Sequence, residues 1–237
     1  MNGADPFLTR RPGGAQIVPE PTLKRPGDVP PWSGKTPDVS LSAVLARLAR
    51  GVSPVGVTSS PRADERISAV MVLLVDGPQG AEVLLTRRSS TMTNHRGEIS
   101  FPGGRVDPDE DITSAARREA QEEVGLQVHP SAVHGRLSSL STFVSKSYIV
   151  PVVAAIDTKP ALSLHDAEVD RAFWIPLREL AAPDVFEWEW WSFYSATDTE
   201  RPMFFFYLHD ETVWGATARV LHELLCVVHG VDHREPG

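Results

Sequence analysis

Three glutamates crowd one short stretch of the chain, where Glu119, Glu122 and Glu123 directly follow Arg118. Helix positions i, i+3 and i+4 share one face, so these carboxylates repel one another by a few tenths of a kcal/mol per pair. No lysine is interleaved among them, as a solvated face would normally have. A divalent cation such as Mg²⁺ or Mn²⁺, which prefers hard oxygen ligands, would offset the repulsion. By themselves, the three residues also fit an acidic, solvated helix.

The glutamates fall in residues 112–124, which carry the signals of a helix. Asp111 suits the N-cap, and Gly125 stands where a left-handed residue ends a helix. A separate apolar stripe can pack on a sheet, and it consists of Ala116, Ala120 and Val124. The pattern therefore predicts a helix with one packed stripe and one acidic face.

The remaining elements are short β-type runs and a few helices. Residues 67–75 and 81–88 flank the turn-rich sequence DGPQG, which predicts a hairpin. Further strands are expected at 147–156, 171–177 and 203–208, and further helices at 41–50, ending at Gly51, and at 214–228. Strands and helices without a regular βαβ rhythm predict an α/β (α+β) fold with a mixed sheet.

The first 38 residues differ from the rest of the chain in composition. They are rich in Pro and Gly and poor in large apolar residues, so they cannot form a core of their own. We expect residues 1–38 to form an extended or disordered arm, and residues 39–237 to form the main domain with a helix at its N-terminal end.

Charge and cysteine content narrow the class of protein. The 237-residue chain has a formal net charge of −8, which disfavours non-specific binding to nucleic acid or anionic membranes. The single cysteine, Cys226, excludes an intrachain disulfide and favours a reducing, cytoplasmic location. The apolar run at 69–75 is too short to span a bilayer, and the N-terminus lacks a signal-peptide core. A soluble cytoplasmic protein is expected.

Residues 104–126 resemble the Nudix box, Gly-x5-Glu-x7-Arg-Glu-U-x-Glu-Glu-x-Gly-U, where U is a bulky aliphatic residue. The Gly, Glu and Arg positions of the motif all match, and the one departure is Ala120 at a packing position. The resemblance implies a metal-dependent Nudix hydrolase domain over residues 39–237. Its implied fold is an α/β/α sandwich around a mixed sheet.

The resemblance also implies roles for individual residues. Glu122 would be an additional metal ligand or the base that acts on water, and Arg118 would pair with Glu110 or a neighbouring glutamate to hold the carboxylates in place. The catalytic set would then be Arg118 and Glu122, with Glu168 as a candidate for a further acidic group near the metal. Glu168 alternatively reads as an ordinary exposed loop carboxylate. The implied ligands of Mg²⁺ or Mn²⁺ are Gly103 (through its carbonyl), Glu119, Glu122 and Glu123.

Residues 84–104 resemble the signature of coenzyme A pyrophosphatases, Leu-Leu-Thr-x-Arg-Ser/Ala-x3-Arg-x3-Gly-x3-Phe-Pro-Gly-Gly. Thr93 departs from it, because the pattern has an arginine there that could contact a phosphate. Arg87 or Arg96 could compensate. The resemblance, which extends over about residues 65–228, implies hydrolysis of the coenzyme A diphosphate to 3′,5′-ADP and 4′-phosphopantetheine. The implied substrate-binding residues are Arg88, His95 and Arg96.

Three alternative functions compete with this one. The departure at Thr93 keeps open a Nudix pyrophosphatase acting on another nucleoside diphosphate derivative or a (d)NTP. An isomerase of the isopentenyl diphosphate type is disfavoured, because Cys226, the only cysteine, lies far from the box. A non-catalytic module is disfavoured, because all three glutamates of the box are present. The expected partner is a small nucleotide.

Two further patterns remain outside the box. The aromatic run at 186–194 is explained better by core or dimer-interface packing than by stacking on adenine or covering pantetheine, and a homodimer stays open. Near the C-terminus, a continuous helix would align four metal-ligating residues. Gly230 is expected to break that helix, and HELLC is not the His-Glu-x-x-His zinc motif. A fraying tail is therefore favoured over a zinc site for His222, Cys226, His229 and His233.

Overall fold

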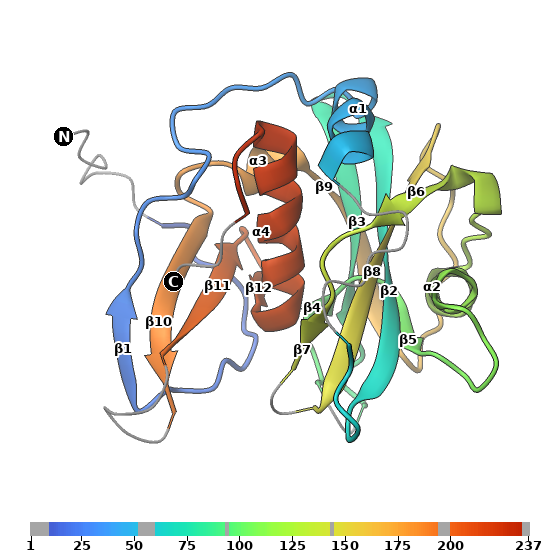
Figure 1. Cartoon of the computed structure of the whole chain (residues 1–237), viewed down its shortest axis with the longest axis horizontal. Coiled ribbons are helices and arrows are strands. Elements are labelled where there is room, and N and C mark those ends of the chain that lie inside the picture. Colours follow the sequence, from blue (N-terminus) through green and yellow to red (C-terminus); the bar gives the residue numbers. More distant parts are fainter. Residues whose placement is uncertain (1–9, 52–59, 93–94, 143–144, 194–199, 234–237) are drawn as a thin grey trace. The chain divides into compact units, whose positions relative to one another are not determined.

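The computed structural model describes five stretches of the chain (Figure 1), namely residues 10–51, 60–92, 95–142, 145–193 and 200–233. They belong to two compact units. Residues 38–178 form one unit, and the other combines residues 1–37 with residues 179–237. The short helix α3 (Leu177–Leu180) lies across the division. None of the helices in these stretches is long and apolar enough to cross a membrane.

The unit of residues 38–178 is built on one mixed, eight-stranded sheet (Figure 1). Its central strand β2 (Arg66–Gly77) pairs antiparallel with β3 (Gly80–Arg88) and parallel with β8 (Ser147–Ile156). Five more strands attach to these three: β4 (Ile99–Ser100) and β9 (Val169–Pro176) to β3, β5 (Gly103–Arg105) to β2, and β6 (Val133–Arg136) and β7 (Leu140–Ser141) to β8. The predicted mixed sheet is confirmed.

The predicted hairpin joins β2 to β3. Its register runs from Leu74 opposite Val83 to Gly77 opposite Gly80. Gly80 has φ of 101°, and a Cβ atom there would lie within 3.0 Å of the backbone oxygen of Val39. Both the backbone angle and the crowding therefore require glycine at the end of this turn.

Helix α2 (Ile112–Val124) begins and ends where the sequence predicted. The Asp111 carboxylate accepts hydrogen bonds from the backbone N–H groups of Thr113 and Ser114, at 2.9 and 3.1 Å. Gly125 ends the helix with φ of 73°. The predicted apolar stripe is fully buried in a core shared with the sheet, and it comprises Ala116, Ala120 and Val124. This packing fixes the direction in which the glutamates of α2 point.

Two short helices complete this unit. The predicted amphipathic helix is α1 (Leu41–Gly51), in which Val44 and Leu48 are fully buried. The 3₁₀ helix η1 (Pro130–Ala132) follows α2 and leads into β6.

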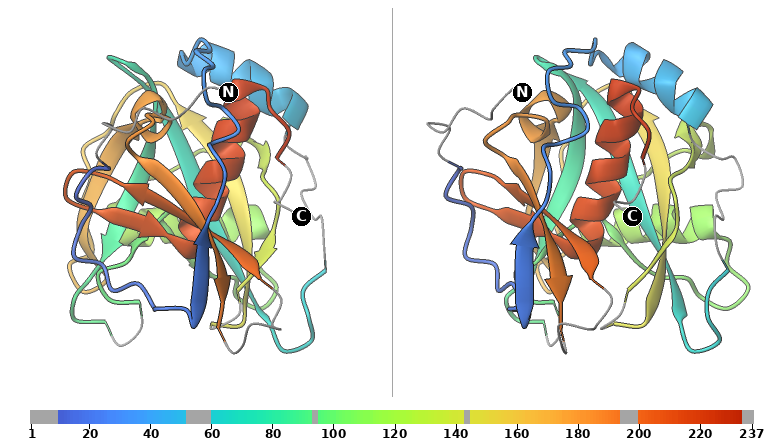
Figure 2. Two further views of the ribbon diagram at one scale, coloured as in Figure 1. Left: turned by 90° about the vertical axis from the view of Figure 1, so that its left-hand side faces the viewer. Right: turned by 60° about the vertical axis from the view of Figure 1, so that its left-hand side comes forward.

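The second unit is a four-stranded antiparallel sheet with a helix packed on it (Figure 2). In the order of the sheet, the strands are β1 (Leu23–Pro26), β10 (Phe186–Ser192), β11 (Arg201–Tyr207) and β12 (Thr212–Trp214). Helix α4 (Gly215–His229) contacts β11 and β12. The aromatic run of β10 packs within this unit, since Trp188 and Trp191 are buried beside the rings of Phe204 and Phe205.

Part of the predicted N-terminal arm forms structure within this second unit. Strand β1 pairs with β10 from Leu23–Ser192 to Pro26–Glu189. Trp32 is buried, with its ring 4.8 Å from that of Phe186. Composition shows only that the arm lacks a core of its own, whereas a strand needs just the free backbone groups at a sheet edge. The domain boundary at residue 38 stays a prediction.

Candidate functional site

The three glutamates of α2 extend from the interior of their unit to solvent. The side chain of Glu123 is 3% exposed, that of Glu119 is 13% exposed and that of Glu122 is 56% exposed. Glu119 and Glu122 accept hydrogen bonds from the same Arg118 nitrogen, so their carboxylates lie side by side. A ligand here would meet one buried, one half-enclosed and one open carboxylate.

Two glycines bring the backbone of β5 against these carboxylates. The Gly103 N–H donates to Glu123 Oε2 at 3.2 Å. A Cβ atom on Gly104 would fall within 3.0 Å of the Glu119 carboxylate, and one on Gly103 would fall equally close to the backbone of Ala69. The backbone of β2 therefore leaves no room for a side chain at Gly103, and a side chain at Gly104 would displace the Glu119 carboxylate.

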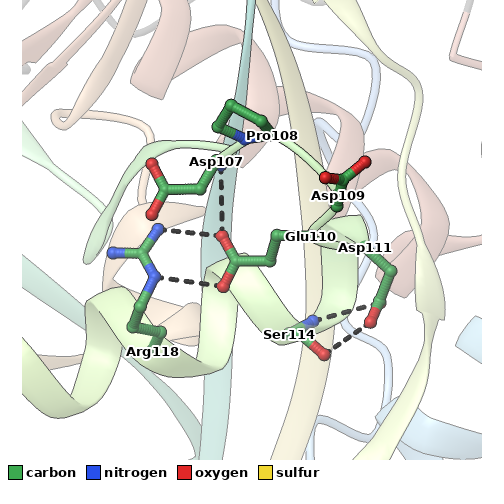
Figure 3. A pocket seen from close by; sticks show the side chains of 7 residues that line it. All are labelled: Asp107, Pro108, Asp109, Glu110, Asp111, Ser114 and Arg118. Atoms are coloured by element: carbon green, nitrogen blue, oxygen red, sulfur yellow. Dashed lines mark hydrogen bonds and ion pairs between the residues drawn. The ribbon is translucent and has the colours of Figure 1, made fainter.

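Arg118 connects the acidic loop before α2 to the glutamates on the helix, and Figure 3 shows its pairing with Glu110 of the loop. Its Nε and Nη2 atoms each donate to one oxygen of Glu110 at 3.0 Å, which is a bidentate pair. Its Nη1 atom donates to Glu119 at 2.9 Å and to Glu122 at 3.0 Å. The expected pairing of Arg118 with Glu110 is therefore present, and the same guanidinium also holds two of the three glutamates.

The electrostatics of the site differ from one carboxylate to the next. Burial raises the pKa of Glu123 to about 8, and it also raises the pKa of Glu119. The hydrogen bonds from Arg118 instead lower the pKa of Glu110. Glu123 thus lies where a negative charge is costly unless a cation is close by.

The donor set fits a hard divalent cation. Carboxylate oxygens from one helix lie beside the backbone of Gly103, and Mg²⁺ and Mn²⁺ favour oxygen ligands of this kind. Burial disfavours the charged form of the Glu123 carboxylate, and a bound cation would stabilise that form. Arg118 holds Glu119 and Glu122 in place without contacting Glu123, so the site is ordered but its charge is only partly compensated.

Arg88, at the end of β3, is the one cation that the described residues place beside Glu123. Its Nη1 atom lies 3.7 Å from Glu123 Oε1, and Nη2 donates to the sulfur of Met92 at 3.1 Å. Among the described residues, the buried Nε of Arg88 has no hydrogen-bond partner. A guanidinium with a spare donor beside a carboxylate cluster is suited to bind a phosphate.

Glu168 lies in the turn before β9, close enough for its charge to affect the buried carboxylates. Its charge contributes to the raised pKa of both Glu119 and Glu123. Its side chain is 42% exposed, and it lies 3.4 Å from the His165 ring. The turn is tied to β3, because the Ser89 N–H donates to the Glu168 backbone oxygen at 2.8 Å. The structure therefore brings Glu168 to the same region as the glutamates of α2.

The other predicted substrate-binding residues lie on the loop between β3 and β4. His95 has φ of 55°, and its Nδ1 atom lies 3.0 Å from Glu98 Oε2, an interaction that raises the His95 pKa. Arg96 is exposed. Thr93, the departure from the coenzyme A signature, lies outside the described residues. His95 and Arg96 are exposed on this loop, whereas Arg88 reaches the buried carboxylate of Glu123.

Sequence reasoning missed one contact of this site, the approach of Arg88 to Glu123. From the sequence, Arg88 was expected to bind the substrate, and no contact with Glu123 was predicted. The two residues are far apart in the chain, and no local spacing links the end of a strand to the last turn of a helix. Burial along β3 gave no signal either, because residues 81–86 are all buried without alternation and Arg87 and Arg88 are both partly buried.

Comparison with known proteins gives consistent results. The family model described as NUDIX domain matches residues 65–197. The Nudix hydrolase NudL of Photorhabdus laumondii is 34% identical over 165 residues, covering 68% of this chain and 84% of the relative. The protein of the same name from Yersinia pestis is 30% identical over 168 residues, covering 68% and 79%. A solved MutT/nudix family protein from Enterococcus faecalis superposes with a TM-score of 0.51 at 19% identity, covering 78% of this chain and 68% of that one.

Proposed function

Because this chain belongs to the NUDIX domain family and is a hydrolase of phosphoric anhydrides, we propose that it cleaves the diphosphate of coenzyme A or of a coenzyme A derivative. The products would be 3′,5′-ADP and 4′-phosphopantetheine. The same family match confirms the predicted fold class, α/β with a mixed sheet. Action on a nucleoside diphosphate derivative follows from the family, and coenzyme A is the finer proposal.

One observation carries the choice of substrate. The stretch at 84–104 that resembles the coenzyme A signature includes Arg88, whose guanidinium lies 3.7 Å from Glu123 and keeps a buried Nε without a partner among the described residues. A substrate phosphate that approaches the carboxylate cluster would find this donor at its edge. In this proposal, Arg88 of the coenzyme A signature and the carboxylates of the Nudix box therefore act on the same diphosphate group of the substrate.

Glu119, Glu122, Glu123 and the carbonyl of Gly103 are the residues proposed to hold Mg²⁺ or Mn²⁺. When bound, the cation neutralises diphosphate charge and lowers the pKa of a coordinated water. Arg118 positions Glu119 and Glu122 through its Nη1 atom, and it fixes the loop through Glu110. Glycine at 103 and 104 allows the backbone to come close to the carboxylates.

Hydrolysis requires a group that accepts a proton from the attacking water. The water oxygen forms a bond to phosphorus, the bond from phosphorus to the bridging oxygen breaks, and one water proton passes to a carboxylate. Glu122 and Glu168 are the candidates, since their side chains are 56% and 42% exposed and can reach bulk water. Arg88 is proposed to bind a phosphate of the substrate, with His95 and Arg96 contacting the substrate from the loop between β3 and β4.

A product assay tests the substrate directly. The purified chain with Mg²⁺ or Mn²⁺ would be given coenzyme A, NADH, ADP-ribose and 8-oxo-dGTP in parallel, and the products would be identified by liquid chromatography and mass spectrometry. We expect 3′,5′-ADP and phosphopantetheine at the highest kcat/KM. Intact coenzyme A beside cleavage of another substrate would overturn the proposal while leaving the family assignment in place.

The alternative substrate is another nucleoside diphosphate derivative or a (d)NTP. It is favoured by the neutral Thr93, which stands where the coenzyme A signature has an arginine. The same assay decides between the two, because each substrate releases a different product.

A further inference from the structure

Three metal-ligating side chains converge at the C-terminal end of α4. His222, Cys226 and His233 each offer one ligand atom, and these atoms lie within 4.8 Å of one another. All three belong to the unit that contains residues 179–237, whereas the glutamates of the box belong to the other unit. The cluster is therefore made of nitrogen and sulfur donors that the proposed hydrolysis does not use.

A reversal of the chain at Gly230 creates this convergence. Gly230 ends α4 with φ of 62°, and its N–H is directed to the carbonyls of Cys226 and Val227. The Val231 N–H then donates to the Cys226 carbonyl at 3.0 Å, so the chain folds back along the helix. The ring of His233 comes to 5.2 Å from the ring of His222.

The structure thus differs from the fraying tail that the sequence favoured. The helix does end at Gly230 as expected, but a left-handed cap turns the following residues back toward the helix instead of releasing them. His229 does not join the cluster, because its Nδ1 atom lies 2.8 Å from the carbonyl of Leu225. Three of the four residues with metal-ligand spacing remain together.

The donor atoms of the cluster are buried and poorly satisfied. His222 and Cys226 are buried, and the two ring nitrogens of His222 lie 3.9 and 4.0 Å from the Cys226 sulfur, which are long distances for a hydrogen bond. The buried Nδ1 of His233 has no hydrogen-bond partner among the described residues. Buried polar nitrogens normally have partners, so a missing ligand is a natural explanation.

The surroundings of the cluster favour a neutral imidazole. His222 stacks on Phe204, with ring centres 4.5 Å apart, and also lies beside Phe186 and Trp32. Burial lowers the pKa of His222 to about 3, which leaves a nitrogen lone pair available. Burial raises the pKa of the Cys226 thiol to about 12, so a bound cation has to displace the thiol proton.

We propose that His222, Cys226 and His233 form a binding site for Zn²⁺. Two imidazoles and one thiolate are borderline-soft ligands, which select Zn²⁺ over the Mg²⁺ or Mn²⁺ preferred by carboxylates. The fourth position is filled by Glu223 or by water, because Glu223 Oε2 lies 3.9 Å from His233 Nε2. The ion would fasten the segment after Gly230 to α4.

The single cysteine makes Co²⁺ a specific probe of this site. The metal-free, reduced full chain would be titrated with Co²⁺ in excess Mg²⁺, which occupies the carboxylates of the box. A thiolate-to-Co²⁺ charge-transfer band can arise only from Cys226, since the chain has no other cysteine. We expect one equivalent of Co²⁺ to produce the band, and Zn²⁺ to abolish it by competition.

Substitutions test whether the charge-transfer band comes from Co²⁺ bound to the His–Cys cluster. C226S should lose it, and H233A should weaken Co²⁺ binding by at least about tenfold, the lower bound for loss of an outer-shell partner. H134A is the matched control, because His134 is an exposed imidazole on β6, and it should leave the titration unchanged. Circular dichroism checks that each variant folds.

The proposal is overturned if the wild-type chain shows no charge-transfer band, or if H233A and H134A bind Co²⁺ equally. His233 decides the outcome even if C226S fails to fold, because its side chain is 17% exposed and lies beyond the last turn of α4. A failure here leaves the hydrolase proposal untouched, since the two metal sites share no residue.

Discussion

The carboxylate site on α2 and the His–Cys cluster on α4 both place metal-ligating side chains on a helix, but the ligands differ in charge and in surroundings. On α2, three like charges repel one another, and Arg118 holds two of them by hydrogen bonds of 2.9 and 3.0 Å. On α4, the donors are neutral and surrounded by aromatic rings, such as that of Phe204. The charge of the first site is only partly compensated by arginines, whereas the second contains a buried nitrogen, His233 Nδ1, that has no hydrogen-bond partner among the described residues.

This contrast indicates how one chain could keep two cations apart. Hard oxygen ligands that retain access to water suit Mg²⁺ or Mn²⁺ and a phosphate substrate. Nitrogen and sulfur ligands in a buried, apolar environment suit Zn²⁺ in a closed, structural site. Donor chemistry and solvent access, rather than total charge, would therefore determine which ion each site takes.

The largest expected effect comes from E123Q, which removes the buried charge of the carboxylate site while keeping the shape of the side chain. We expect kcat to fall at least about 100-fold, since one preorganised electrostatic contact typically contributes that much. The fold should persist, because the variant no longer buries a carboxylate whose pKa is raised to about 8. Steady-state kinetics with a thermal melt would measure both, and retained activity with normal metal dependence would refute the assignment of Glu123.

A smaller loss is expected from R118K, which keeps the charge but not the bidentate geometry. Lysine cannot hold Glu110, Glu119 and Glu122 at once, so the activity or the apparent Mg²⁺ affinity should fall by about 10–100-fold. R117K is the matched control, because among the described residues the neighbouring Arg117 donates to the backbone carbonyl of Val128 and forms no ion pair with the glutamates. An equal response of both variants to a Mg²⁺ titration would show that Arg118 does not position the site.

Substitutions of Arg88 and Arg96 should differ in their effect on KM. R88Q removes a guanidinium beside Glu123 that has a spare buried donor, and we expect KM to rise about tenfold, as for loss of a charge-assisted hydrogen bond. Arg96 is exposed, so R96A should raise KM by no more than about fivefold. If R96A raised KM more than R88Q did, the phosphate contact would have to be assigned to Arg96 instead of Arg88.

What could be read from the sequence was local. The Asp111 cap, the Gly125 stop and the glutamate face of α2 all depend on residues within a few positions of one another, and the β2–β3 hairpin depends on the turn at Gly77–Gly80. Such features follow from helical and strand periods alone. The resemblance to the Nudix box then supplied a reason for the spacing.

The features that could not be predicted depend on contacts between distant segments. The approach of Arg88 to Glu123 needs β3 and α2 to be placed on one sheet, and the pairing of β1 with β10 joins Leu23 to Ser192. The return of His233 is different, because its cause, Gly230, was recognised in the sequence. A helix stop was correctly predicted there, but composition does not tell whether the chain leaves the helix or turns back along it.

The smallest expected effect is a thermal shift that separates the two metal sites. Zn²⁺ at about 100 times its Kd should stabilise the folded chain by about 2.7 kcal/mol, which corresponds to a rise in Tm of about 2–4 °C per kcal/mol for a chain of this size. In excess Mg²⁺, this rise should persist in E123Q and fall to about half or less in H233A, because the proposed Zn²⁺ ligands include His233 but not Glu123. The activation by Mg²⁺ should show the reverse dependence. If E123Q abolished the Zn²⁺ shift, both cations would bind the carboxylate site and the contrast between the two helices would fail.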